Sequence, residues 1–482
     1  MSTIDVTIIE TPNLGDRSYV VALDGTAVVI DPQRDIDRVQ AVLEAQGLTV
    51  THVLETHIHN DYVSGGLVLA GQLGAEYIVP AGYALAYEAT QLSDGASFTS
   101  GRMSWRVVHT PGHTPQHLSY AVAVDGVDEA VFTGGSMLFG SVGRPDLLGP
   151  DLTLGLAHDQ WRSVRRLVDE VAGDAAVYPT HGFGSFCSVT ATVGLESTVA
   201  QQRTTNPALT LSEQEFVDEL VAGLDAYPAY YAHMGPSNQA GPGPVDLSLP
   251  GPADAAELRR RIDAGEWVVD LRARKLFARG HLRGTLSFDG EGNAITYLGW
   301  LIPWGTPVTL LGESEQQVQA FQRDLVQIGI DRPAAHATGS PTEWALDAER
   351  DVLAFPQTDF EGLAKAQADD PELLVLDTRR NLEWHDGHVR GARHLPIHEL
   401  IGRIDEVVAW SRAAEHAGHD ATVWVYCGSG FRAAAVCSLL ERVGVPVVHV
   451  DDDWGNAALK GAAVVSEERP DETHRFGAAV TA

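Results

Sequence analysis

The chain has 482 residues, of which 44% are hydrophobic and 20% are charged, and its formal net charge at pH 7 is −32. This length exceeds what one hydrophobic core supports and predicts roughly three domains, while the composition excludes extensive disorder. The negative charge excludes nucleic acid as a favoured partner, because its phosphates would be repelled.

Neither a membrane helix nor a secretory signal is visible in the sequence. No apolar run reaches the roughly 18 residues that a membrane helix needs. The first residues, "MSTIDVTIIETP", lack the basic and apolar regions of a signal peptide. We therefore expect a cytoplasmic protein with no membrane partner.

Short apolar runs alternate with turns over residues 1 to about 200. Two strands joined by a tight turn at Asp24-Gly25 are predicted by "YVVALDGTAVVIDP", and a helix ended by Gly47 is predicted by "RDIDRVQAVLEAQG". Three further strands are predicted in "THVLETH", "WRVVHTPGHTPQH" and "AAVYPTHG". Histidines collect just after these strands, in loops that a rigid scaffold would hold in place.

A candidate metal site begins in "ETHIHNDYVSGG", where His57, His59 and Asp61 follow a predicted strand. His113 and His181 each follow another predicted strand and are further candidate donors. Imidazole and carboxylate ligands suit zinc or iron. The sequence therefore predicts a metal site built from separate loops.

A helix is predicted to begin after Ser212, where Glu215 completes a capping box. Residues 227 to 244 follow it and are rich in proline, glycine and tyrosine, which indicates an ordered linker that docks on its neighbours. The remaining sequence contains an internal repeat, with "VVDLRARKLFARGHLRG" at 268–284 and "VLDTRRNLEWHDGHVRG" at 375–391. Strands alternate with helices in both copies, which predicts two α/β domains with parallel sheets.

The second copy contains a reactive-cysteine motif. Cys427 ends the predicted strand "VWVY", and Arg432 lies five residues later, at the start of a predicted helix. The helix N-terminus and the loop N–H groups would form an anion-binding nest, and the arginine would add positive charge, so a thiolate nucleophile is expected. Cys437, inside the helix, is expected to be a small buried residue. The loop residues that would bind a persulfide or anion are Gly428, Ser429, Gly430 and Phe431.

This cysteine motif, with the upstream Asp-x-Arg and Gly-His-x-x-Gly, resembles the rhodanese family over roughly residues 246 to 340 and 357 to 465. The resemblance implies that Cys427 carries sulfur as a persulfide. In the first copy, Gly312 of "TLLGES" stands where Cys427 stands in the second, and that copy has no cysteine at all. We therefore expect the first copy to be a structural or docking module.

The metal motif, with the spacing from His57 through His113 to His181, resembles the metallo-β-lactamase fold over about residues 1 to 200. The resemblance implies a first metal site formed by His57, His59 and His113. It implies a second site formed by Asp61, the residue at 62 and His181.

The sequence departs from that family at two metal-binding positions. Tyr62 stands where a histidine is expected, and Gly135 of "VFTGGSMLFG" stands where a bridging aspartate is expected. Glycine has no donor side chain, and a phenol with a pKa of about 10 is a poor ligand at neutral pH. We therefore expect a single metal.

The combination of the two folds resembles persulfide dioxygenase–rhodanese fusions, and "GSVGRPDL" and "YYAHM" strengthen the likeness. It implies one Fe(2+) on His57, His113 and a carboxylate, with Gly135 in the carboxylate position. His59, Asp61 or a water molecule would complete the site. In the leading interpretation, Asp61 and His181 surround the ligands without binding the iron. The implied substrates are a low-molecular-weight thiol persulfide or thiosulfate, and the fusions also suggest an oligomer of identical chains.

Two other functions stay open from the sequence. One is a hydrolase of glyoxalase II type, which would use Zn(2+) to activate water against a thioester. The other is a metal-free scaffold whose only activity is sulfur transfer through Cys427.

The expected fold is thus α/β and α+β in several domains. It consists of a metallo-β-lactamase αββα sandwich followed by two rhodanese-like α/β domains with parallel sheets. The expected boundaries are 1–205 for the sandwich, 206–245 for the helix and linker, 246–345 for the first repeat and 357–475 for the second repeat.

Overall fold

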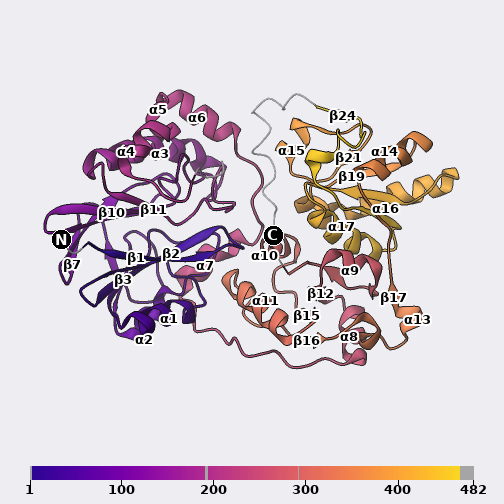
Figure 1. The fold of residues 1–482 in the computed structure, drawn as a ribbon, viewed down its shortest axis with the longest axis horizontal. Coiled ribbons are helices and arrows are strands. Elements are labelled where there is room, and N and C mark those ends of the chain that lie inside the picture. The colour runs from indigo at the N-terminus through magenta and orange to yellow at the C-terminus, as the bar shows by residue number, and fades with distance from the viewer. Residues whose placement is uncertain (1–2, 190–193, 291, 467–482) are drawn as a thin grey trace. The chain divides into compact units, whose positions relative to one another are not determined.

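The computed structural model describes residues 3–189, 194–290 and 292–466 (Figure 1). The chain forms two compact units. The first takes in the described residues up to Asp246 together with Val326–Ile330, and the second takes in Leu247–Leu325 and the described residues from Asp331 onward. Among the helices of these described segments, none is long and apolar enough to cross a membrane.

The first unit is built on a pair of sheets. One has the strand order β1-β2-β3-β4-β5-β6, formed by Asp5–Thr11, Asp16–Leu23, Thr26–Ile30, Thr49–Leu54, Glu76–Pro80 and Thr90–Leu92. The other has the order β11-β10-β9-β8-β7, formed by Ala176–Pro179, Val127–Gly134, Leu118–Val124, Met103–His109 and Ser97–Ser100. The helices are α1 (Asp37–Gln46), α2 (Gly66–Leu73), α3 (Pro150–Glu170), α4 (Val199–Thr205), α5 (Pro207–Thr210), α6 (Glu213–Ala222) and α7 (Tyr231–Ala240).

Alternating side chains of the buried strands define the layers of this unit. On β2, Tyr19 points into a core that also contains Trp105 of the second sheet, whereas Val20 points into a core that contains Leu69 of α2. On β9, Ala121 packs toward α3 in a third core. Because both faces of each sheet are covered, the unit is an αββα sandwich, which confirms the predicted fold.

Local predictions in this unit are also confirmed. Asp24 and Gly25 have φ values of 51° and 80°, which suits the tight turn between β2 and β3. Gly47 ends α1 with a left-handed φ of 64°, and Ser212 caps α6 in a capping box. The predicted linker contains α7, so part of it is helical.

The second unit contains both copies of the repeat, each with a parallel sheet. The first copy has the order β14-β12-β15-β16, formed by Leu286–Ser287, Trp267–Asp270, Val308–Gly312 and Ala335–Thr338. The second has the order β18-β23-β22-β19-β21, formed by Gln357–Thr358, Val447–Val450, Val423–Tyr426, Leu374–Asp377 and Arg393–His394.

Helices and short strands complete the two copies. Those of the first copy are α8 (Ala255–Asp263), α9 (Arg274–Arg279), α10 (Ala294–Leu301), α11 (Glu315–Gln327), α12 (Pro341–Trp344) and α13 (Ala348–Asp351), with β13 (His281–Leu282) paired to β17 (Val352–Leu353). Those of the second are α14 (Phe360–Asp369), α15 (Asn381–Asp386), α16 (Leu400–Ala417), α17 (Phe431–Arg442), η1 (Ile397–Glu399) and η2 (Trp454–Asn456), with β20 (His388–Val389) paired to β24 (Val464–Val465).

The repeated Asp-x-Arg motif forms the same buried ion pair in both copies. Arg272 Nη2 lies 2.6 Å from Asp270 Oδ2, and its backbone N–H also donates to this carboxylate. Arg379 and Asp377 make the same contacts, at 2.6 Å and 2.9 Å. The motif therefore stabilises the end of the central strand and lies outside the reactive loop.

Replacing Asp377 by asparagine should destabilise the second unit strongly. The substitution leaves the guanidinium of Arg379 buried without a counter-charge, because only 1% of this arginine is exposed. The expected loss in unfolding free energy is about 3 kcal/mol or more, equivalent to a fall of roughly 6 °C or more in the Tm of a domain of this size. Scanning calorimetry of the full chain measures it.

The matched control is Asp263→Asn, which removes an exposed ion pair with Arg259 in the same unit. This variant should melt like the wild-type chain. Equal melting temperatures for Asp377→Asn and the wild type would show that the buried pair contributes nothing to stability.

Candidate metal centre and cysteine loop

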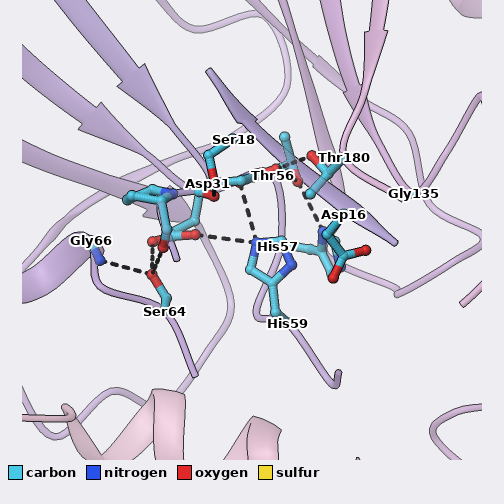
Figure 2. A network of polar contacts seen from close by, with 12 residues as sticks. Asp16, Ser18, Asp31, Thr56, His57, His59, Ser64, Gly66, Gly135 and Thr180 are labelled. Atoms are coloured by element: carbon cyan, nitrogen blue, oxygen red, sulfur yellow. Dashed lines mark hydrogen bonds and ion pairs between the residues drawn. The ribbon is translucent and has the colours of Figure 1, made fainter. Parts of the chain in front are cut away.

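The strand β4 leads directly into the predicted metal loop, and its end determines the tautomer of His57. The Thr56 hydroxyl donates to Asp31 Oδ2 at 2.8 Å, so its oxygen is left to accept the Nδ1–H of His57 at 2.9 Å. Asp31 is fully buried and also accepts hydrogen bonds from Thr56 N and the Thr180 hydroxyl (Figure 2). His57 therefore presents an unprotonated Nε2 to the interior.

His113 is oriented in the same way by a backbone carbonyl. Its Nδ1–H donates to Arg144 O at 2.9 Å, whereas its buried Nε2 has no hydrogen-bond partner in the described part of the chain. Burial and the imidazole of His181 lower the pKa of His113 to about 3. The ring is therefore neutral, with its lone pair free for a ligand.

His181 is the third ring of this kind, and two carboxylates face its Nδ1. That nitrogen lies 2.8 Å from Asp16 Oδ1 and 3.1 Å from Asp61 Oδ2. Burial opposes a charge on the ring, but Asp61 and Asp16 outweigh it and raise the pKa of His181 well above its ordinary value. Burial and Asp61 raise the pKa of Asp16 to about 8.

His57, His113 and His181 converge on one point. Each offers a donor atom, and the donor atoms lie within 4.8 Å of one another. The Nε2 atoms of His57 and His181 are 3.3 Å apart. Two imidazole nitrogens bound to one zinc-sized or iron-sized ion at 2.0–2.1 Å would be separated by about 3.0–3.4 Å.

These observations fit a single transition-metal ion. All three Nδ1 atoms face protein acceptors, which is the usual arrangement behind metal-bound histidines. All three rings are also buried. The Nε2 of His113 has no hydrogen-bond partner among the described residues, and a metal ion would supply one. All three donors are imidazoles, whereas the set that the resemblance implied contained a carboxylate. Two carboxylates, Asp16 and Asp61, face only the Nδ1 of His181.

His59 has a different environment from the other predicted ligands. Its Nε2 lies 3.2 Å from Glu55 Oε2, 3.3 Å from Asp31 Oδ1 and 2.9 Å from the hydroxyl of Tyr62. Burial disfavours the cation, but Asp31 and Glu55 outweigh it and raise the pKa of His59 to about 9. His59 is thus a buried cation beside the His57–His113–His181 set.

Two other groupings of potential ligands share His59. One joins it to Asp61 and His181, and the other joins it to Asp31 and Glu55. Tyr62 stacks on the ring of His59, with the ring centroids 4.2 Å apart. Burial raises the pKa of Tyr62 well above its ordinary value, so its phenol stays neutral and cannot replace the missing histidine as an anionic ligand.

Gly135 leaves no space for the aspartate that the family resemblance places there. A Cβ atom at this position would lie 2.3 Å from Cδ2 of His113 and 2.8 Å from its Nε2. The ring of His113 therefore occupies the volume that a side chain would need. The His113 ring can take this position only because residue 135 has no side chain.

Several residues that hold the site were not predicted from the sequence. Asp31 and Asp16 orient the rings of His57 and His181, although each lies far from them in the sequence. His117 accepts the N–H of Gly135 at its Nε2, at 3.0 Å, and thereby fixes the backbone beside His113. Of the three, only His117 had a sequence signal, because it ends the motif "HTPGHTPQH".

In the second unit, Cys427 lies at the end of β22 and at the foot of α17. Its Sγ accepts hydrogen bonds from the backbone N–H groups of Gly430 at 3.1 Å and Ala433 at 3.4 Å. Gly430 has a left-handed φ of 87°, which turns the loop inward. The loop thus forms a nest of N–H groups around the sulfur, as the sequence pattern suggested.

Arg432 points to a carboxylate. It forms a bidentate ion pair with Glu383 of α15, at 2.6 and 2.7 Å. Burial opposes a charge on Glu383, but Arg432 outweighs it and lowers the pKa of this carboxyl to about 2. A Cβ atom on Gly428 would lie 2.8 Å from Arg432 Nη2, so a glycine at this position leaves space for the guanidinium.

In the first copy, the side chain of Gln317 lies in the loop that is equivalent to the cysteine loop. Gln317 accepts the N–H of Glu313 at its Oε1 and donates from its Nε2 to Leu271 O, both at 2.8 Å. A Cβ atom on Gly312 would lie 3.0 Å from the same Oε1. The site of the missing cysteine is therefore filled, and this loop has no room for a persulfide.

The first copy also reaches the cysteine loop of the second. Arg274 donates to Ser429 O at 3.2 Å and pairs with Asp451 at 2.7 Å. Tyr297 of α10 lies with its ring centroid 5.8 Å from the guanidinium carbon of Arg432. The cysteine-less copy thus contributes two side chains to the surroundings of the loop.

Comparisons with known proteins identify both parts of the chain. The family model of the metallo-beta-lactamase superfamily matches residues 14–182, and that of the rhodanese-like domain matches residues 361–456. A crystal structure of a metallo-beta-lactamase from Staphylococcus aureus subsp. aureus COL matches with a TM-score of 0.63 at 27% identity, covering 70% of this chain and 100% of the other.

Two kinds of curated relatives match part of the chain. Hydroxyacylglutathione hydrolase of Rhizobium etli is 31% identical over 185 residues, covering 37% of this chain and 66% of that protein. The mitochondrial persulfide dioxygenase ETHE1 of Homo sapiens is 31% identical over 205 residues, covering 42% of this chain and 72% of that protein. The chain therefore belongs to the persulfide dioxygenase family of the metallo-β-lactamase superfamily and carries a C-terminal rhodanese-like domain in addition.

Proposed function

We propose that this chain oxidises a low-molecular-weight persulfide at an iron site in its first unit and transfers sulfane sulfur through Cys427 in its second. The proposal is carried by one observation: three imidazole donors converge within residues 14–182, which the metallo-beta-lactamase family model matches, in a chain with persulfide dioxygenase relatives. The rhodanese-like match around Cys427 supports the second activity. Together they favour an enzyme of sulfur metabolism with small sulfur compounds as substrates.

His57, His113 and His181 are the residues that would hold the Fe(2+). A bound Fe(2+) with open positions would supply the one-electron chemistry that reaction with O₂ requires. Asp16 and Asp61 keep a proton on Nδ1 of His181 and direct its Nε2 inward. Asp31 does the same for His57 through Thr56. The buried rings exclude bulk water, so the reactants meet in a low-dielectric interior.

The proposed oxidation is balanced as RSSH + O₂ + H₂O → RSH + H₂SO₃. The outer sulfur is oxidised to sulfite, and O₂ is reduced. The S–S bond breaks, and the inner sulfur leaves as the thiol. The carrier thiol R is a small molecule of the cell.

The proposed transfer begins with the Cys427 thiolate, which attacks the outer sulfur of thiosulfate. A new S–S bond forms, the S–S bond of thiosulfate breaks, and sulfite leaves. The N–H groups of Gly430 and Ala433 already face the sulfur and would stabilise its charge. Joining both activities in one chain raises the effective concentration of the persulfide that they share.

A hydrolase of glyoxalase II type is the second candidate, because hydroxyacylglutathione hydrolases match the chain at similar identity. That reaction would use Zn(2+) to activate water. The filled volume beside Gly135 and the neutral Tyr62 argue against the binuclear arrangement that the resemblance implied.

Metal analysis and oxygen uptake test the iron site. The full chain, purified without chelator, should contain about one iron per chain and consume O₂ with glutathione persulfide, releasing sulfite. His181→Ala should lose both properties, since it removes one of three donors. His158→Ala, which removes an α3 histidine paired with Glu213, is the control and should retain both. Zinc with thioester hydrolysis would favour the hydrolase, and a metal-free wild type would favour the scaffold.

Gly135→Ala tests whether the packing beside His113 matters for the metal. The added methyl would press on the His113 ring, so bound iron should fall by at least half under the same purification. Gly71→Ala is the control, because a Cβ atom there meets nothing within 4 Å. Full iron occupancy in Gly135→Ala would show that the ring tolerates a side chain at this position.

Cys427→Ser should abolish sulfur transfer from thiosulfate to cyanide. Mass spectrometry of the wild-type chain after thiosulfate should show one added sulfur on Cys427, and the variant should show none. Cys437→Ala, which changes a fully buried thiol of α17, should keep both properties. Undiminished transfer in Cys427→Ser would refute the assignment of this thiol.

A further inference from the structure

The helix α7 contacts the metal loop through one buried side chain. Asn238 Nδ2 donates to the carbonyls of His59 and Tyr62, both at 2.9 Å, and its Oδ1 accepts the N–H of Ser64 at 2.8 Å. Only 3% of this asparagine is exposed. One side chain thus satisfies three backbone groups of the loop that begins at His57.

The approach of α7 to this loop is close. A Cβ atom on Gly235 would lie 2.9 Å from the side-chain oxygen of Asn60, the residue between His59 and Asp61. The helix begins almost fifty residues after the end of the metallo-beta-lactamase family match at residue 182. The metal loop is therefore held by a segment outside the matched domain.

The residues just before α7 contact Arg144, and the backbone of Arg144 orients His113. The carbonyl of Arg144 accepts the Nδ1–H of His113, so the position of this residue controls that ligand. The guanidinium of Arg144 donates to Asp225 O at 2.5 Å and lies 4.8 Å from the ring centroid of Tyr227. It also pairs with Asp146 at 2.7 Å.

We infer that residues 225–240 form a clamp on the metal centre. Asn238 is the positioning residue of the clamp itself, and Arg144, which the clamp contacts, is a positioning residue for His113. The inference rests on the proposed metal site and adds to it the segment that keeps its loops in place. Loops that carry ligands must lose conformational freedom before they bind a metal. The clamp removes that freedom in advance, because its contacts reach the loop of His57 directly and reach His113 through Arg144.

Co(2+) titration of the full-length apo chain tests the clamp, with the visible absorption of bound Co(2+) as the readout. Asn238→Leu keeps the branched shape of the side chain and removes its three hydrogen bonds. We expect the dissociation constant for Co(2+) to rise about 10- to 100-fold, as for other residues that orient metal ligands, and the absorption spectrum to change.

Asn206→Leu is the matched control. Asn206 is a buried asparagine of the same unit, and its amide likewise donates to two carbonyls, those of Leu138 and Ser141. It touches none of the three metal-binding histidines in the described structure. This variant should lose a similar amount of thermal stability and keep the Co(2+) affinity and spectrum of the wild type.

Tyr227→Leu provides a milder test if Asn238→Leu fails to fold. It removes the aromatic face beside Arg144 and leaves the ion pair with Asp146. It should weaken Co(2+) binding in the same direction by a smaller factor. The clamp is refuted if the folded variants of α7 and Tyr227 bind Co(2+) like the wild type, or if Asn206→Leu weakens binding equally. A wild-type chain that binds no Co(2+) would instead refute the metal site itself.

Discussion

The first unit depends on where three imidazole rings keep their ring protons. Nδ1 of His57 donates to a threonine hydroxyl that Asp31 has already engaged, Nδ1 of His113 donates to a carbonyl, and Nδ1 of His181 faces carboxylates. Each of these contacts leaves an Nε2 atom directed at the same small volume. A histidine whose ring proton sat on the other nitrogen could not bind a metal there, so the acceptors determine the chemistry as much as the ligands do.

This arrangement explains how the site accommodates the loss of a carboxylate at position 135. The ring of His113 fills the space, and His181 supplies a third nitrogen. The nearest carboxylates, those of Asp16 and Asp61, lie behind the His181 ring, where they face its Nδ1. In the proposed site, three imidazole ligands would add no negative charge to the metal, which should favour anionic substrates such as a deprotonated persulfide.

The sequence predicted elements whose signals are local. The turn at Asp24-Gly25, the end of α1 at Gly47 and the cap at Ser212 each depend on a few neighbouring residues, and the structure confirms them. The histidine-rich loops were also predictable, because each follows a buried strand. The internal repeat was visible as matching motifs, and the matching ion pairs of both copies confirm it.

Other features depend on contacts between distant segments, and no local pattern reports them. Asp16 reaches His181 across 165 positions, and Asn238 reaches Tyr62 across 176. His59 and His181 look equivalent as sequence, but their carboxylates lie on different ring nitrogens. Those beside His59 face its Nε2, whereas those beside His181 face its Nδ1 and leave its Nε2 toward His57. Likewise, the sequence placed Arg432 beside the cysteine loop without showing that Glu383 neutralises it.

The contacts of Arg274 and Tyr297 with the cysteine loop bear on the history of the repeat. After a tandem duplication, a copy without its own thiol would ordinarily be free to drift or to be deleted. Here its deletion would strip Asp451 of its arginine and uncover Arg432. Both copies thus contribute to the surroundings of a single cysteine, although only one of them carries the thiol.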